Sequence, residues 1–137
     1  MPKRDFFHTQ IRIALEKDGW IITADPYKVI WEGKTFLPDL GAERVLAVER
    51  GAEKLAVEIK SFIGEFGVEF YEALGQFDSY CFAIADFEPE RKVVLAVTLD
   101  AYVLYFEQAY VARTIALKNI PVVVVDTDNQ TVVKWIK

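Results

Sequence analysis

The stretch that indicates the fold most directly is Lys54-Leu55-Ala56-Val57-Glu58-Ile59-Lys60. In it, large apolar residues at odd positions alternate with Ala56, Glu58 and Lys60 at even positions. Because successive side chains of a β-strand point to opposite faces, the apolar set is predicted to face a core and the even set the other side of the sheet. The strand therefore places a carboxylate and an ammonium group, Glu58 and Lys60, side by side on one face.

The segments before this strand predict a helix followed by short strands. Residues 50–53 form a predicted turn that leads into the Lys54 strand, and Glu32-Gly33 forms another turn between two short strands. Gly19 is the predicted stop of the first helix. The predicted elements are a helix over 4–18 and strands over 20–23, 27–31, 35–37 and 44–49.

The segments after it predict helices interleaved with buried strands. The runs 93–97 and 122–125 are continuously apolar, which is typical of strands covered on both faces. Asp100 is the expected N-cap of a helical stretch that is broken once and stops at Asn119. Gly64 and Gly67 loosen the chain before a long predicted helix that runs to residue 85. The elements predicted after it are a strand over 93–97, helices over 100–118, and strands over 122–125 and 131–136. We expect an α/β fold with a mixed β-sheet flanked by helices, in a single domain over 1–137.

Composition excludes several classes of protein. The 137 residues are 53% hydrophobic and 27% charged, which excludes a disordered chain. No apolar run approaches the ~20 residues of a membrane-spanning helix, and the N-terminus does not resemble a signal peptide, so we expect no membrane association and a cytoplasmic location. One cysteine and one histidine cannot make a zinc site of Cys/His type within one chain.

Charge and the lone histidine further limit the candidate chemistry. The net charge of −5 argues against tight nonspecific binding to nucleic acid. Residues 1–68 carry 10 basic against 11 acidic residues, and residues 69–137 carry 6 against 10, so a phosphate-facing surface is expected in the first half. His8 lies on the predicted first helix with no serine in a strained turn to serve, which discounts it as a catalytic base although it could border a site.

The candidate site combines Asp39 with Glu58 and Lys60. Asp39 follows Pro38, and 18 residues separate it from Glu58. If Asp39 lies on the strand next to Glu58, two carboxylates converge beside a lysine, an arrangement suited to Mg²⁺. Taken singly, a Pro-Asp pair is typical of a turn and Glu-x-Lys of a solvated strand face, so the order and context of the residues carry the hypothesis.

These residues resemble the Pro-Asp…(Asp/Glu)-x-Lys nucleases, the PD-(D/E)xK superfamily with the restriction-endonuclease-like fold. Pro38-Asp39 and Glu58-Ile59-Lys60 match its motif, and Gln76 and Tyr80 match the helical Gln-x-x-x-Tyr element of many members. The resemblance implies a restriction-endonuclease-like core and Mg²⁺ or Mn²⁺ as cofactor. It also implies Asp39, Glu58, Lys60 and Gln76 as catalytic residues, with Asp39 and Glu58 as metal ligands. Spacing alone leaves Gln76 open between a boundary residue bonded to backbone and a phosphate or metal-water contact, and makes packing the expected role of Tyr80.

A closer resemblance, over essentially the whole chain, is to the XisH family of cyanobacteria. The segments that carry it are 39–43, 56–62 and 73–76, with the opening Arg4-Asp5 and the closing Trp135-Ile136. XisH proteins are named as controlling factors for excision of the fdxN element, and the resemblance implies a paired XisI-like protein as partner. Two functions stay open, a Mg²⁺-dependent DNA endonuclease acting in programmed excision and a non-catalytic module that binds DNA or protein and assists a recombinase. We also expect a homo-oligomer, because paired cutting of duplex DNA needs two sites.

Overall fold

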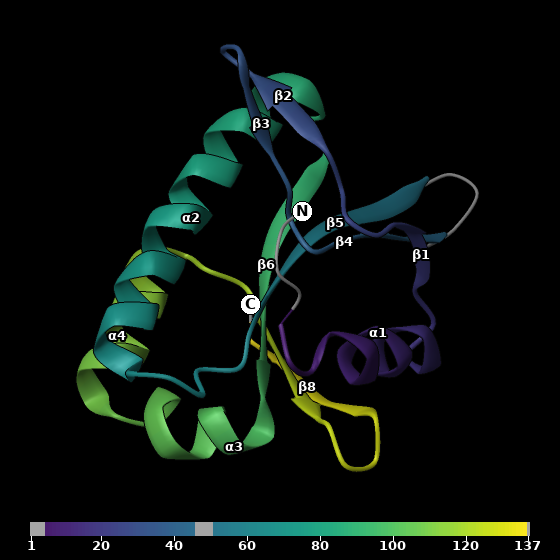
Figure 1. Ribbon diagram of the computed structural model, residues 1–137. Helices are drawn as coiled ribbons and strands as arrows, with labels where there is room; N and C mark the ends of the chain where they lie inside the picture. The colour runs from purple at the N-terminus through teal and green to yellow at the C-terminus, as the bar shows by residue number, and fades with distance from the viewer. Residues whose placement is uncertain (1–4, 46–50, 137) are drawn as a thin grey trace.

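The computed structural model describes residues 5–45 and 51–136, which form a six-stranded mixed sheet with helices on both faces (Figure 1). The strand order is β1-β4-β5-β6-β7-β8. Strands β5, β6 and β7 run parallel, while β1 pairs with β4, β4 with β5 and β7 with β8 in antiparallel fashion. The predicted mixed α/β architecture is confirmed.

The elements agree with the predicted segments in kind and differ at their ends. No helix among the described residues is both long and apolar enough to cross a membrane. In chain order, the helices and strands are α1 (His8–Lys17), β1 (Ile21–Ala24), β2 (Val29–Trp31), β3 (Lys34–Phe36), β4 (Leu40–Val45), β5 (Ala52–Lys60), α2 (Phe66–Phe87), β6 (Arg91–Thr98), α3 (Leu99–Ala101), the π-helix η2 (Tyr102–Phe106), α4 (Ala109–Leu117), β7 (Val122–Asp126) and β8 (Thr131–Ile136).

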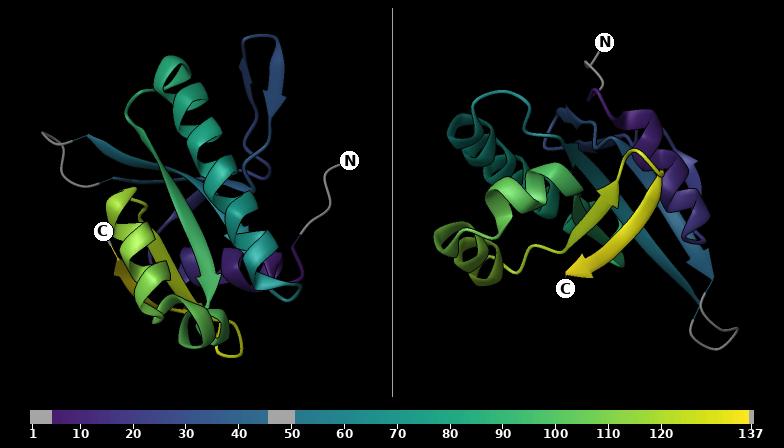
Figure 2. Two further views of the ribbon diagram at one scale, coloured as in Figure 1. Left: turned by 90° about the vertical axis from the view of Figure 1, so that its left-hand side faces the viewer. Right: turned by 90° about the horizontal axis from the view of Figure 1, so that it is seen from below.

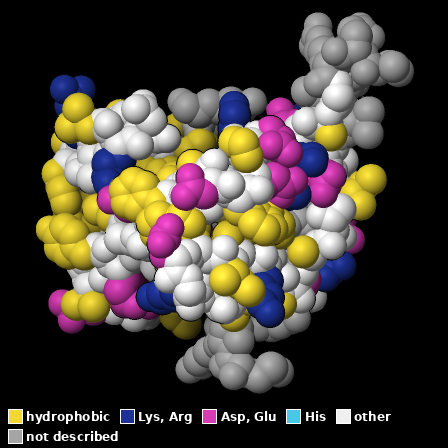
Figure 3. All heavy atoms as spheres, turned by 90° about the horizontal axis from the view of Figure 1, so that it is seen from above, with side chains coloured by type: hydrophobic (Ala, Val, Ile, Leu, Met, Phe, Trp, Pro, Cys, Tyr) yellow, Lys and Arg dark blue, Asp and Glu magenta, His cyan; other side chains and the backbone are white. Residues whose placement is uncertain are grey.

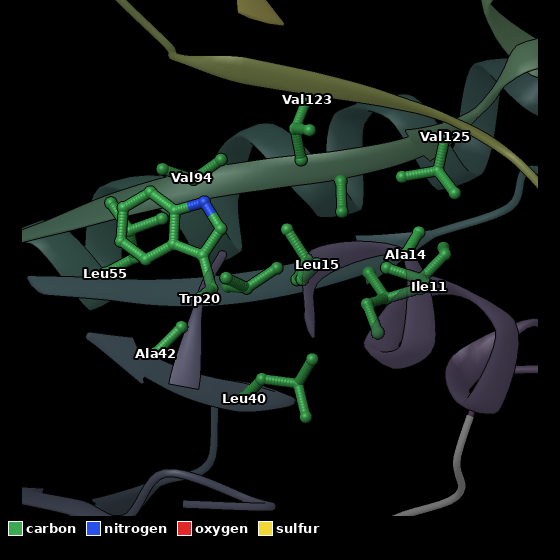
Figure 4. Close-up of a cluster of buried hydrophobic side chains, with 13 residues drawn as sticks. Ile11, Ala14, Leu15, Trp20, Leu40, Ala42, Leu55, Val94, Val123 and Val125 are labelled. Carbon is green, nitrogen blue, oxygen red and sulfur yellow. The ribbon is translucent and has the colours of Figure 1, made fainter. Parts of the chain in front are cut away.

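Both faces of the central strands are buried, each against different helices. On one face Leu55, Val94 and Val123 pack with Leu15 of α1 and with Trp20, as Figure 4 shows. On the other face Ala56 of β5 packs with Tyr80 and other residues of α2, and β6 and β7 pack with α3, η2 and α4. Figure 2 shows α1 on one side of the sheet with α2 and α4 on the other. The even positions of β5, Glu58 among them, therefore face a helix rather than solvent.

The β2–β3 hairpin lies outside the main sheet and packs against α2 (Figure 1). Its predicted turn is confirmed, because Glu32 and Gly33 both have positive φ, as the two-residue turn of a twisted hairpin requires. Trp31 Nε1 donates a hydrogen bond to Asp86 Oδ2 of α2 at 2.8 Å, and the ring of Phe36 meets that of Tyr80 edge to face with centroids 6.1 Å apart. The hairpin is thus fixed beside the middle and end of α2.

Several predicted helix ends are wrong for identifiable local reasons. The first helix begins at His8, where the backbone N–H of Phe7 is bonded to the Asp5 carboxylate at 2.9 Å. Thr98, not Asp100, is the N-cap after β6, because its hydroxyl accepts from the N–H of Ala101. The long helix begins at Phe66, so Gly67 lies inside it. Residues 46–49 of the strand predicted over 44–49 lie outside the described residues, and the observed β4 begins earlier, at Leu40.

Candidate functional site

The antiparallel register of β4 and β5 brings Asp39 beside Glu58. Leu40, the first residue of β4, pairs with Val57. Continuing the register by one position sets Asp39 opposite Glu58. Two residues that are separated by 18 others in the sequence are therefore neighbours across the paired strands. The Oδ2 atom of Asp39 accepts a hydrogen bond from the backbone N–H of Ile59 at 2.7 Å, which fixes its carboxylate against β5.

The two carboxyl groups share a hydrogen bond, and together they hold a proton near neutral pH. Burial and the charge of Asp39 raise the pKa of Glu58 to about 9. Burial also raises the pKa of Asp39, against the opposing effect of its bonds from Ile59 N–H and from Glu58. The hydroxyl of Tyr80 donates to Glu58 and favours its ionised form. The pair therefore carries one proton at neutral pH, and the Ile59 N–H on Asp39 favours placing that proton on Glu58.

Lys60 lies on the same side of β5 as Glu58. Its Nζ atom is 3.8 Å from Glu58 Oε2, and its side chain is 20% exposed. The ammonium group lowers the pKa of Glu58, but less than burial and Asp39 raise it. Lys60 thus keeps a cation at the mouth of a site whose carboxyl groups are nearly enclosed.

All four predicted site residues line one cavity of about 220 Å³, together with Asp5, Leu37 and Tyr80. Gln76 enters it from α2, where its Oε1 atom is buried and has no hydrogen-bond partner among the described residues. A buried amide oxygen without a donor carries a desolvation cost of about 1–3 kcal/mol. The cavity therefore presents an acceptor that is suited to a donor or a cation from outside the chain.

Asp5 is a cavity residue for which the sequence pattern predicted no role. Its Oδ2 atom accepts from both the backbone N–H and the hydroxyl of Ser61, each at 3.0 Å, which ties the start of the chain to the end of β5. Its negative charge raises the pKa of Asp39. No spacing rule links it to Asp39, 34 positions along, and only the folded chain brings the two together.

Tyr80 and His8 do more than pack in the core, because each affects the pKa of a carboxyl group of the site. Tyr80 is buried in the core as predicted, and its hydroxyl also bonds Glu58. Burial, followed by the charge of Glu58, raises the pKa of Tyr80, so it remains a donor. His8 is buried with its Nε2 atom 2.9 Å from Asp25 Oδ1, and its proximity lowers the pKa of Asp39. It borders the site and does not line the cavity.

The donors available to a metal ion are oxygen atoms from few side chains. Among residues 5–45 and 51–136, no group of three or more His, Cys, Asp or Glu side chains is placed to hold a metal. The close pair is Asp39 with Glu58, and Asp5 adds charge without completing such a group. An ion that uses one or two carboxylates and keeps its waters, as Mg²⁺ does, fits this donor set better than one that needs a full protein cage.

Comparison with known proteins gives one consistent family. The model of the family described as XisH protein matches residues 1–133. A crystal structure of an XisH family protein from Nostoc punctiforme is 38% identical, with a TM-score of 0.87, covering 97% of this chain and 100% of that one. A crystal structure of a fdxN element excision controlling factor protein from Anabaena variabilis is 36% identical, with a TM-score of 0.87, covering 98% and 100%. No curated protein matches the chain. On the family match and these full-length likenesses, the chain belongs to the XisH family.

Proposed function

We propose that this chain is a Mg²⁺-dependent phosphodiester hydrolase that acts on DNA during programmed element excision. The observation that carries the proposal is the shared cavity of Asp39, Glu58, Lys60 and Gln76. It joins a carboxyl pair, a lysine and an unsatisfied amide oxygen at the end of one strand. These are the groups of the PD-(D/E)xK pattern, and the proposal includes membership of that superfamily.

The residues present fit Mg²⁺ or Mn²⁺ as cofactor. Asp39 and Glu58 would hold the ion, and Glu58 would give up its proton when the ion binds. Burial and, after it, the negative charge of Asp39 raise the pKa of Glu58 to about 9, and a cation bound between the two carboxylates would offset both effects. When bound, the ion supplies Lewis acidity at a phosphodiester oxygen and lowers the pKa of coordinated water.

The remaining site residues have separate roles. Lys60 stabilises negative charge that develops on the phosphate, a contribution typically of about 2.7–4 kcal/mol for one donor. The Gln76 amide oxygen accepts a hydrogen bond from a water or substrate donor in the cavity, which satisfies its lone pairs. The Ile59 N–H and the Tyr80 hydroxyl position the two carboxyl groups.

A nicking assay tests this function. Purified protein is incubated with supercoiled plasmid and Mg²⁺ or Mn²⁺, alone and with an XisI-like protein. We expect relaxed circles from the wild type and none from Asp39→Asn, which removes a negative ligand. The matched control is Asp100→Asn, since Asp100 is an exposed aspartate on α3 that does not line the cavity. Intact plasmid after incubation of the wild type with ion and partner would overturn the proposal.

A second candidate is a non-catalytic module that holds a protein partner such as an XisI-like protein or a recombinase. It is favoured by the net charge of −5 and by exposed apolar side chains on α2 and α4, including Tyr71, Phe82, Tyr110 and Leu117. Figure 3 shows apolar side chains gathered on the left, the side of α2 and α4 in Figure 1. Full excision in cells by Lys60→Ala would favour this candidate and end the nuclease proposal.

A further inference from the structure

A groove runs between the β2–β3 hairpin and α2 and meets the carboxylate cavity. Its volume is about 520 Å³. Leu37, Gln76 and Tyr80 line both the groove and the cavity, so the two lie next to each other. Lys34 and Thr35 line it from the hairpin, and Tyr71, Gly75 and Ser79 from the helix.

Gly75 is the feature of this groove that packing does not explain. It lies inside α2, where glycine costs about 1 kcal/mol relative to alanine. A Cβ atom built at Gly75 would meet nothing within 4 Å, and the residue has no positive φ that would require glycine. Nothing among the described residues therefore needs the missing side chain, and Gly75 keeps open only the groove itself. Glycine in such a place is suited to close approach by the backbone of a ligand.

We propose that this groove binds an unpaired nucleic-acid strand and leads its backbone across Gly75 to the carboxylate cavity. The inference rests on the proposed function and names its substrate class. The groove has the scale of small-ligand pockets, about 300–1,000 Å³, which accommodates one or two nucleotides and not a duplex. Single strands, frayed ends and gaps are then the preferred substrates.

The groove carries the groups that a single strand uses. The Tyr71 side chain is 66% exposed and offers a face for base stacking, worth about 1–3 kcal/mol per base. Lys34 brings an ammonium group, whose Nζ lies 5.1 Å from the Phe36 ring centroid, and Thr35 and Ser79 bring hydroxyls. Glu72 lines the same groove and cancels the charge of Lys34. Binding therefore depends on stacking and hydrogen bonds, and its dependence on salt should be shallow.

The test measures strand binding without cleavage. Fluorescence anisotropy follows a labelled twelve-nucleotide DNA and its duplex on the full chain in a chelating buffer. The variants are Gly75→Leu and, as matched control, Gly67→Leu, because Gly67 lies in the same helix with equally open space but outside the groove. Thermal unfolding of each variant shows whether it folds.

We expect the wild type to prefer the single strand, and Gly75→Leu to weaken that binding by about tenfold or more, which is about 1.4 kcal/mol. Gly67→Leu should bind as the wild type does, and both variants should unfold at or above the wild-type temperature. Equal binding by Gly75→Leu and wild type, a preference for duplex, or no binding at all would overturn the proposal. Loss of binding in Gly75→Leu beside an inactive nicking assay would support the groove and reject the hydrolase.

Discussion

Glu58 and Glu88 are both partly enclosed glutamates, and their surroundings shift them in opposite directions. Burial and the charge of Asp39 raise the pKa of Glu58 to about 9, while bonds from Arg91, Tyr27 and Lys54 lower that of Glu88 to about 2. The distances from Glu88 are 2.7 Å to Arg91 Nε and 3.1 Å to Lys54 Nζ. Glu58 has one lysine beside it and a second carboxylate close by, whereas Glu88 is bonded by two cations.

The Glu88 cluster consists of Glu88 with Arg91, Tyr27 and Lys54, which all bond to its carboxylate, and it stabilises the fold. Arg91, whose side chain is 4% exposed, also donates to the carbonyl of Leu55 at 2.8 Å and to Glu43 at 3.2 Å. Its guanidinium lies 4.5 Å from the Tyr27 ring centroid. The Glu58 cluster instead keeps a protonated carboxyl and an unpaired Gln76 oxygen. The contrast shows which buried polar cluster is the better candidate for a functional site. It is the one whose groups keep a shifted pKa or an unsatisfied hydrogen-bond acceptor.

The largest expected effect is on stability, from Arg91→Met. The change removes the buried guanidinium from the half-buried Glu88 and Glu43 and should lower the free energy of unfolding by about 3–5 kcal/mol. Urea unfolding at pH 7 measures it. The matched control is Arg113→Met, an exposed arginine on α4 whose loss should cost no more than about 0.5 kcal/mol. A loss at Arg91 as small as at Arg113 would remove the structural role given to this cluster.

The next effect is on catalysis, from Lys60→Ala. If the cavity cuts phosphodiesters, the nicking rate should fall by about two to three orders of magnitude, because a donor to the charged phosphate is lost. Folding should be nearly intact, since Lys60 faces a mostly protonated Glu58. Lys54→Ala is the control on the same strand. It removes an ion pair of the Glu88 cluster and should keep its nicking rate while losing some stability.

A smaller effect is the pH dependence of stability in chelating buffer. Between its ordinary value of 4.5 and about 9, folded Glu58 binds more proton than unfolded Glu58, so its contribution falls as pH rises through that window. Glu88 behaves oppositely, and its contribution is present above 4.5 and lost as pH falls toward 2. Each slope is at most about 1.4 kcal/mol per pH unit. Urea unfolding gives the free energy of unfolding of each variant at each pH. For Glu58→Gln this free energy should lack the wild-type decrease across pH 5–9, and for Glu88→Gln it should lack the wild-type increase across pH 2–5. A Glu58→Gln curve parallel to wild type would contradict the shared-proton pair.

The smallest effect is from Tyr80→Phe, which removes the donor to Glu58. The pKa of Glu58 should rise further, and stability should fall by about 1 kcal/mol for the lost hydrogen bond. Carboxyl titration by NMR measures the first and urea unfolding the second. Tyr105→Phe, at a half-buried tyrosine of η2, should leave the pKa of Glu58 unchanged. An unchanged pKa of Glu58 in the Tyr80→Phe variant would mean that Tyr80 contributes only packing.

The sequence alone determined the kind and order of the helices and strands, and the core-facing residues of the central strands. The alternation in residues 54–60 indicated one strand, because successive strand side chains point to opposite faces. The continuous apolar runs at 93–97 and 122–125 indicated two more, because strands covered on both faces are mostly apolar. Helix ends were harder, since Thr98 and Asp100 are equally good caps in sequence and only the backbone geometry after β6 selects Thr98. For the candidate site, the spacing of Asp39, Glu58 and Lys60 indicated two carboxylates beside a lysine.

Only the tertiary structure decided which of those charged groups are buried, which are paired and which remain unpaired. The register of β4 on β5 sets Asp39 against Glu58, and α2 covers them with Tyr80 and Gln76. Asp5 reaches the cavity through Ser61, a contact between residues 56 positions apart that no local pattern encodes. Sequence fixes the kinds of groups through short-range periodicity, while pKa values and unsatisfied atoms depend on long-range packing that brings distant segments into one low-dielectric space.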